Sequence, residues 1–133
     1  MNMEDLDTFA RTIYGEARGE SLDGQIAVAW TILNRVRAKS WYGDTITEVC
    51  RKPWQYSCWN HDDPNLATLT AVSLNNQSFQ RCMYAALAVG LQIVPDPTSR
   101  SMHYHVLSVS PSWAEGKSPV CTIGNHKFYN DVD

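Results

Sequence analysis

The segment Tyr14-Gly15-Glu16-Ala17-Arg18-Gly19-Glu20 places two acids where a helix of a folded domain buries apolar side chains. Upstream of it, apolar residues recur at helical spacing and define one core-facing stripe: Leu6, Phe9, Ala10, Ile13 and Ala17. At about 100° per residue, Glu16 falls at the edge of that stripe, and Glu20 falls inside it if the helix continues. A carboxylate held against an apolar wall has a raised pKa and can act as a general acid, a chemistry that suits cleavage of a glycosidic bond.

The two acids can be interpreted in two ways, as catalytic groups or as surface charges. If the helix persists, Glu16 and Glu20 are neighbours at i and i+4, and their like charges raise one another's pKa. The glycine before each acid also lets a ligand approach the backbone closely. Alternatively, an ordinary amphipathic helix pairs these glutamates with Arg11 or Arg18 at its surface. The pattern alone leaves both interpretations open.

Length and composition predict one compact domain over residues 1–133, with 44% apolar and 19% charged residues. A net charge of −3 argues against nucleic acid and anionic membrane surfaces as partners. No stretch approaches the roughly 20 apolar residues of a membrane span, and we expect a monomer without stable membrane association. Five Trp and six Tyr are typical of carbohydrate sites, and equally of a well-filled core.

The N-terminus, Met1–Asp5, is acidic and does not have the basic and then apolar pattern of a signal peptide. The four cysteines, Cys50, Cys58, Cys82 and Cys121, permit three two-disulfide pairings. Without an export signal, buried free thiols are the default expectation. Cys50, Cys58 and His61 have the wrong spacing for the common zinc knuckles.

Hydrophobic periodicity predicts helices first and a small β element late in the chain. Helices are expected over about 5–17, 23–38, a short stretch opened by the capping box Thr45–Glu48, about 64–74, and a buried run over 79–91. The aromatic, proline-interrupted stretch 52–60 is interpreted as a loop. Strands are expected over 102–109 and within 122–129, the latter as a strand or a turn into one. The fold class is therefore α+β and predominantly helical.

His103 and His105 lie two apart on a predicted strand and share one face, with His126 on the neighbouring strand. Together with a nearby glutamate they could form the zinc site of an amidase or peptidase. No helical His-Glu-x-x-His accompanies them, so hydrogen bonding to sugar hydroxyls or N-acetyl groups is the simpler interpretation. A nucleophile elbow, a phosphate loop and a dinucleotide fingerprint are all missing from the sequence.

The chain resembles the spore-cortex-lytic-enzyme-like cell-wall hydrolases, which include bacterial germination enzymes and bacteriophage endolysins. The resemblance spans nearly the whole chain in the order of the family: Ala10–Glu20, Gly24–Val36, Gln55–Trp59, His103–Tyr104, Pro111–Trp113 and Ile123–Tyr129. The first block is the specific one. Tyr56 stands where a Phe is more usual, and the exported relatives carry a signal peptide and a separate peptidoglycan-binding domain.

The resemblance implies a lysozyme-like, two-lobed catalytic domain that cleaves the β-1,4 bond between N-acetylmuramic acid and N-acetylglucosamine in peptidoglycan. It places the catalytic glutamate at Glu16, which would act as acid and then base in a lytic transglycosylase, without metal or cofactor. A muramidase would instead need a second carboxylate at a defined separation. Glu20, Asp62 and Asp63 are the candidates, although we expect Glu20 to support the site.

Seven further residues are predicted to bind substrate or support the site: Gln55, Tyr56, Ser57, Trp59, His103, Tyr104 and His126. A short catalytic domain of this kind looks like a phage endolysin. Such an enzyme is made in the bacterial cytoplasm and reaches the wall after a holin opens the membrane. A prophage lysin or a gene-transfer-agent lysin would look the same.

Overall fold

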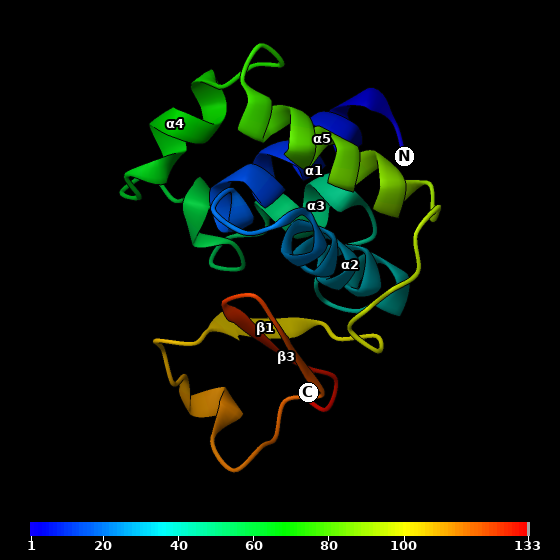
Figure 1. Cartoon of the computed structure of the whole chain (residues 1–133), viewed down its shortest axis with the longest axis vertical. Coiled ribbons are helices and arrows are strands. Elements are labelled where there is room, and N and C mark those ends of the chain that lie inside the picture. The colour runs from blue at the N-terminus through cyan, green and yellow to red at the C-terminus, as the bar shows by residue number, and fades with distance from the viewer. Residues whose placement is uncertain (133) are drawn as a thin grey trace.

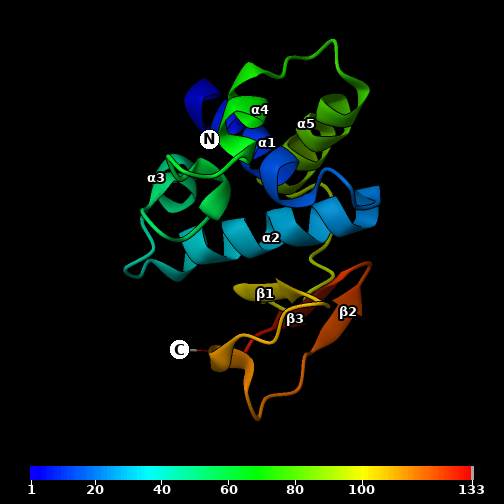
Figure 2. The same ribbon diagram turned by 90° about the vertical axis from the view of Figure 1, so that its left-hand side faces the viewer.

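In the computed structural model, which describes residues 1–132, a helical lobe sits on a small antiparallel sheet (Figure 1). The helices are α1 (Met3–Ala17), α2 (Leu22–Ala38), α3 (Ile46–Arg51), α4 (Asn65–Ala71) and α5 (Gln77–Gly90). The strands β1 (His103–Val106), β2 (Cys121–Ile123) and β3 (His126–Tyr129) form a sheet in the order β1-β3-β2. Seen from the side, α2 lies between the other helices and the sheet (Figure 2). The predicted α+β class is confirmed.

Helix boundaries follow from capping side chains in the sequence. The Asn2 side chain accepts from the Asp5 amide at 2.8 Å and the Asp5 carboxylate accepts from the Asn2 amide at 3.2 Å, so α1 starts with a complete capping box. Ser21 caps α2 by accepting from Gly24. The predicted cap at Thr45 is confirmed, because its side chain accepts from the amide of Glu48 at 3.1 Å.

The predicted end of the first helix is confirmed: α1 ends at Ala17, so the condition that it continue to Glu20 is not met. The amide of Glu20 bonds to the Ala17 carbonyl at 2.9 Å, which closes a turn and sends the chain into α2. Glu20 therefore does not share a helical face with Glu16. Instead of adding to the apolar stripe, its side chain reaches the β2–β3 hairpin.

The other differences from prediction are local. The stretch expected as a loop over 52–60 contains a 3-10 turn, η1 (Ser57–Trp59), and a second such turn, η2 (Ser112–Ala114), follows β1. The strand expected over 102–109 is limited to His103–Val106, because only these residues pair with β3. The segment 122–129, expected as a strand or a turn into one, belongs to a hairpin in which β2 starts at Cys121 and turns into β3 through Gly124 at φ +57°.

Two clusters of buried apolar residues form the core. The larger lies among the helices, where α1 packs against α5 around Phe9, Ile13 and Phe79. The smaller joins the lobes and consists of Ala17, Ala27, Val28 and Phe128, with Tyr104 packed against it.

The described residues contain four free thiols, of which Cys50, Cys58 and Cys82 are buried as expected and Cys121 is half-buried. No helix among residues 1–132 is long and apolar enough to cross a bilayer.

Candidate active site

Glu16 lies in the last turn of α1, at the junction of the two lobes. The phenol of Tyr104, from β1, donates a hydrogen bond of 2.6 Å to Glu16 Oε1, within the range of strong bonds to a carboxylate. Tyr104 itself packs on the cluster that joins helices and sheet. The geometry thus brings together two residues that are 88 positions apart in the sequence and that were both predicted as site residues.

Burial raises the pKa of Glu16 and is the largest influence on it. The hydrogen bonds from Tyr104 and Cys58 lower the pKa in part, while the negative charge of Asp63 raises it further. The pKa of Tyr104 is raised well above its usual value by burial and by the neighbouring Glu16, so it remains a hydroxyl donor. A raised pKa is the property that a general acid needs, so this environment favours the predicted role of Glu16, which stays a prediction.

Close packing against Cys58 explains why the residue before Glu16 is a glycine. A methyl group at this position would come within 2.8 Å of both Cβ and Sγ of Cys58, which lies in η1. The glycine lets η1 pack directly on α1, so that the buried Cys58 thiol can reach the carboxylate. Burial and the neighbouring Glu16 raise the pKa of the thiol, which keeps it protonated as a donor.

Glu20 holds the β2–β3 hairpin. Its Oε1 accepts from the Asn125 amide at 2.9 Å and its Oε2 accepts from Asn125 Nδ2 at 3.0 Å. His126 Nδ1 lies 3.7 Å from Oε1. Burial alone would raise the pKa of Glu20, but the two bonds from Asn125 and the nearby His126 lower it on balance. Both carboxylate oxygens are thus committed to the hairpin, and Glu20 acts as a structural anchor.

Arg35 of α2 is a site residue that the sequence did not single out. It is 7% exposed, and its guanidinium donates to Gln55 Oε1 at 3.0 Å and to the Met102 carbonyl at 2.8 Å. It also stacks over the rings of Tyr42 and Tyr56 at 4.7 and 5.2 Å. Its charge lowers the pKa of Glu16 slightly. Basic residues are common in the last turn of a helix, where they favour the helix dipole, so nothing local distinguishes Arg35.

The residues predicted in the stretch 55–59 are distributed around this arginine and η1. Tyr56 is buried, and its hydroxyl has no hydrogen-bond partner among the described residues. Ser57 is exposed at the start of η1. Trp59 is half-buried, and its indole donates to Thr12 Oγ1 at 2.9 Å, which fixes η1 to the helix that carries Glu16.

The three histidines do not converge on one point. His103 and His105 share a face of β1, as predicted, with the ring of Trp113 at 5.4 and 5.7 Å from their rings. His126 instead lies beside Tyr104, at 5.1 Å between ring centroids. Among residues 1–132, no three His, Cys, Asp or Glu side chains are placed to hold a metal ion. The zinc site considered from the sequence is therefore not formed.

His103 does lie close to the groups around Arg35. Its Nε2 is 3.4 Å from the Tyr42 hydroxyl. Burial and the charge of Arg35 lower its pKa to about 4, so its imidazole is neutral at the pH of most cells. A neutral imidazole can both donate and accept, which suits contact with a sugar hydroxyl.

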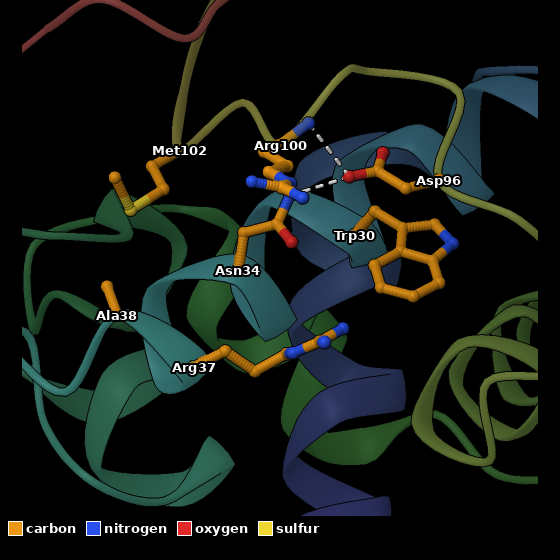
Figure 3. A pocket seen from close by; sticks show the side chains of 7 residues that line it. All are labelled: Trp30, Asn34, Arg37, Ala38, Asp96, Arg100 and Met102. Atoms are coloured by element: carbon orange, nitrogen blue, oxygen red, sulfur yellow. Dashed lines mark hydrogen bonds between the residues drawn. The ribbon is translucent and has the colours of Figure 1, made fainter.

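A cavity of about 450 Å³ lies away from Glu16, between the second half of α2 and the connection to β1 (Figure 3). Asp96 organises that connection by accepting from Asn34 Nδ2 at 2.9 Å and from the Arg100 amide at 3.1 Å. The cavity is lined by Trp30, Asn34, Arg37, Ala38, Asp96, Arg100 and Met102. None of these is a site residue predicted from the sequence, and we assign the cavity no part in the chemistry.

The sequence model of the cell wall hydrolase family matches residues 19–129. The chain belongs to this family. The matched segment includes α2, η1 and the whole sheet, with the hairpin that Glu20 anchors. Glu16 lies just before it, so its catalytic assignment depends on the geometry described above.

Two curated relatives of this cell wall hydrolase are spore cortex-lytic enzymes. That of Bacillus cereus is 27% identical over 128 residues, covering 96% of this chain and 44% of its own length. That of Bacillus subtilis is 28% identical over 127 residues, covering 93% and 37%. The chain thus spans less than half the length of the curated relatives that it matches.

A solved structure of similar fold is the catalytic domain of the germination-specific lytic transglycosylase SleB from Bacillus anthracis. It has a TM-score of 0.72 and 26% identity, and the match covers 98% of this chain and 97% of that domain. The catalytic domain of Bacillus cereus SleB matches with a TM-score of 0.71 and 25% identity over 97% and 91%. This similarity confirms the predicted lysozyme-like fold.

Proposed function

We propose that this cell wall hydrolase is a lytic transglycosylase that cleaves the β-1,4 bond between N-acetylmuramic acid and N-acetylglucosamine in peptidoglycan. The observation that carries the proposal is the half-buried Glu16, with its raised pKa and its 2.6 Å bond from Tyr104, at the junction of the lobes. The similarity to a solved domain described as a lytic transglycosylase supports the reaction type.

In the proposed reaction, protonated Glu16 donates its proton to the glycosidic oxygen as the bond from that oxygen to the muramic anomeric carbon breaks. The 6-hydroxyl of the same muramic residue attacks the anomeric carbon, and Glu16 accepts its proton. The product is a 1,6-anhydro end, no water is consumed, and Glu16 returns to its protonated state. The hydroxyl of Tyr104 stabilises the carboxylate between these two proton transfers.

A hydrolytic outcome remains the second candidate because Asp63 is close enough for its charge to raise the pKa of Glu16. A hydrolase needs such a second carboxylate as nucleophile or base. Glu20 is not available for that task, since Asn125 occupies both of its oxygens. Asp63→Asn separates the two outcomes. A transglycosylase keeps most of its activity in this variant, whereas a hydrolase that depends on Asp63 loses at least about 100-fold.

The direct test of the catalytic assignment is Glu16→Gln, which keeps the shape of the side chain and removes its acid function. We expect a normally folded protein that has lost at least about 100-fold of its peptidoglycan-clearing rate in a turbidity assay. Glu4→Gln, at an exposed position in the first turn of α1, is the matched control. A Glu16→Gln variant that clears peptidoglycan at nearly the wild-type rate contradicts the assignment.

We also propose that the enzyme serves bacterial cell lysis as a phage-type lysin, released to the wall by a holin. The proposal rests on the sequence resemblance to short endolysins. Expression in a bacterial host tests it: lysis should require co-expression of a holin and should be lost with Glu16→Gln. Lysis by the wild-type protein without a holin contradicts this route of release.

A further inference from the structure

The segment Arg51–Asp62 surrounds a cavity of about 440 Å³ that the proposed reaction does not use. Its volume lies in the range of small-molecule binding sites. The cavity is lined by aromatic, cationic and polar side chains, among them Arg51, Lys52, Trp54, Tyr56, Trp59 and Asp62. Tyr56 and Trp59 were predicted to contact substrate, and Asp62 was a candidate second carboxylate; the remaining residues were given no part in substrate binding.

This cavity is fixed to the helix that carries the catalytic carboxylate. Trp59 bonds through its indole to Thr12, which lies one helical turn before Glu16 on the same face of α1. The neighbouring Cys58 packs against Gly15, the residue before Glu16, and its thiol lowers the pKa of Glu16. A ligand held in the cavity is therefore kept at a constant position relative to Glu16.

Trp54 is the unusual member of this lining. Its side chain is 84% exposed, the most among the large apolar residues of the described chain. Its φ is +71°, in a left-handed conformation that is an outlier for a bulky residue and strains the backbone. A residue so exposed contributes little to the core, so packing does not account for a strained tryptophan at the rim of a cavity.

Two cations line the same cavity as Trp54. The Arg51 guanidinium stacks at 4.3 Å over the Trp59 ring, and Lys52 Nζ lies 5.8 Å from the Trp41 ring. Within residues 1–132, neither cation forms an ion pair with a carboxylate. Both charges are therefore free to meet an anionic group on a ligand.

We propose that the Arg51–Asp62 cavity is a separate subsite for one acidic N-acetylated sugar of the glycan strand, beyond the two sugars at the cleaved bond. The apolar C–H face of the pyranose stacks on Trp54, while Arg51 and Lys52 meet the carboxylate carried by muramic acid or its stem peptide. The proposal rests on the proposed function, since it assumes that peptidoglycan glycan is the ligand.

The test measures binding in a Glu16→Gln background, which cannot turn over its ligand. The probe is glycan strands released from peptidoglycan by an amidase. Adding Trp54→Gly removes the platform and relieves the backbone strain at once, because glycine accepts a positive φ. We expect about tenfold weaker binding with an unchanged or higher Tm. Tyr84→Ala, a 56% exposed aromatic on α5, is the matched control and should bind normally.

Two outcomes overturn the subsite: equal affinity with and without Trp54, or a loss of binding that is matched by a drop in Tm. A second probe, a neutral chitin oligosaccharide, tests the charge requirement. Lys52→Met should weaken binding of the glycan strands about fivefold and leave chitin binding unchanged, and equal losses on both probes contradict an acidic ligand. Wild-type protein that binds strands through Trp54 without cleaving them would refute the proposed function and leave the subsite intact.

Discussion

The hydrogen bond from Tyr104 to Glu16 should set the pH range in which the enzyme works. In the first step Glu16 must carry a proton, so the rate falls as the pH rises through the pKa of Glu16. The Tyr104 hydroxyl favours the ionised carboxylate and lowers that pKa. Tyr104→Phe removes this donor and leaves the ring packing in place. The alkaline limb of the rate profile should therefore move to higher pH.

The size of the effect follows from the bond itself. At 2.6 Å, the contact is in the range of an O–H···O⁻ bond, and hydrogen bonds to charged groups contribute about 1.5–3 kcal/mol. Part of this free energy is retained when Glu16 is protonated, because its carboxyl group can still accept a hydrogen bond from the Tyr104 phenol. A net preference of about 1.4 kcal/mol for the carboxylate corresponds to a displacement of the limb by about one pH unit.

The hydrogen bond from Tyr104 to Glu16 should also affect how the free energy of unfolding depends on pH. Burial gives Glu16 a folded-state pKa above its ordinary value of 4.5, so its favourable contribution is complete below that pH and is lost as the pH rises through the folded-state pKa. Tyr104→Phe raises that pKa further. The variant should therefore lose little stability at low pH and about 1.4 kcal/mol more once Glu16 is ionised.

The assay is the initial rate of peptidoglycan clearing against pH, together with urea unfolding at each pH. The same Tyr104→Phe change in the Glu16→Gln background is the control, and its effect on stability should not depend on pH. A limb that stays in place or moves to lower pH, in a variant that folds normally, refutes the role assigned to Tyr104. A pH-dependent effect that persists without Glu16 refutes it equally.

Three further predictions concern the frame of the site. Glu20→Gln should cost about 1–3 kcal/mol at pH 7, measured by urea unfolding, because Asn125 loses a charged acceptor. That cost should shrink as the pH falls through the lowered pKa of Glu20, because the wild-type protein then also loses the bonds from Asn125 to an ionised carboxylate. A cost that does not depend on pH argues against Glu20 as an anchor of the hairpin. Gly15→Ala should lower stability by about 1–3 kcal/mol through its clash with Cys58, whereas Gly19→Ala, which meets no atom within 4 Å, should stay within about 0.5 kcal/mol. Treatment with EDTA should leave clearing unchanged, and inhibition reversed by added zinc would restore the metalloenzyme alternative.

Local signals in the sequence were sufficient for the helices but not for Glu16. The apolar stripe of α1 and the capping side chains mark the helix boundaries within a few residues. At Glu16 the pattern left a surface ion pair equally open, and the family resemblance singled the residue out. The hairpin over residues 121–129 was only partly predicted, because its strands have three and four residues and an alternating pattern is short at that length.

Contacts between distant segments could not be predicted from local patterns. Arg35 reaches Gln55 and Met102 across the domain, and nothing in the helix pattern around it marks that role. Glu20 was expected to support the site, but its partner Asn125 lies 105 residues away and became evident only from the fold. The three histidines looked equivalent in sequence. The sheet turns His126 away from the other two because residues on a strand alternate between faces.

The central claim is that one carboxylate, Glu16, completes the reaction without water. Mass spectrometry of the fragments from digested peptidoglycan tests it most directly. The account predicts 1,6-anhydro-muramic ends with the wild-type protein and with Asp63→Asn, and no new ends with Glu16→Gln. Reducing N-acetylmuramic acid ends from the wild-type protein would contradict it, because they require an attack by water.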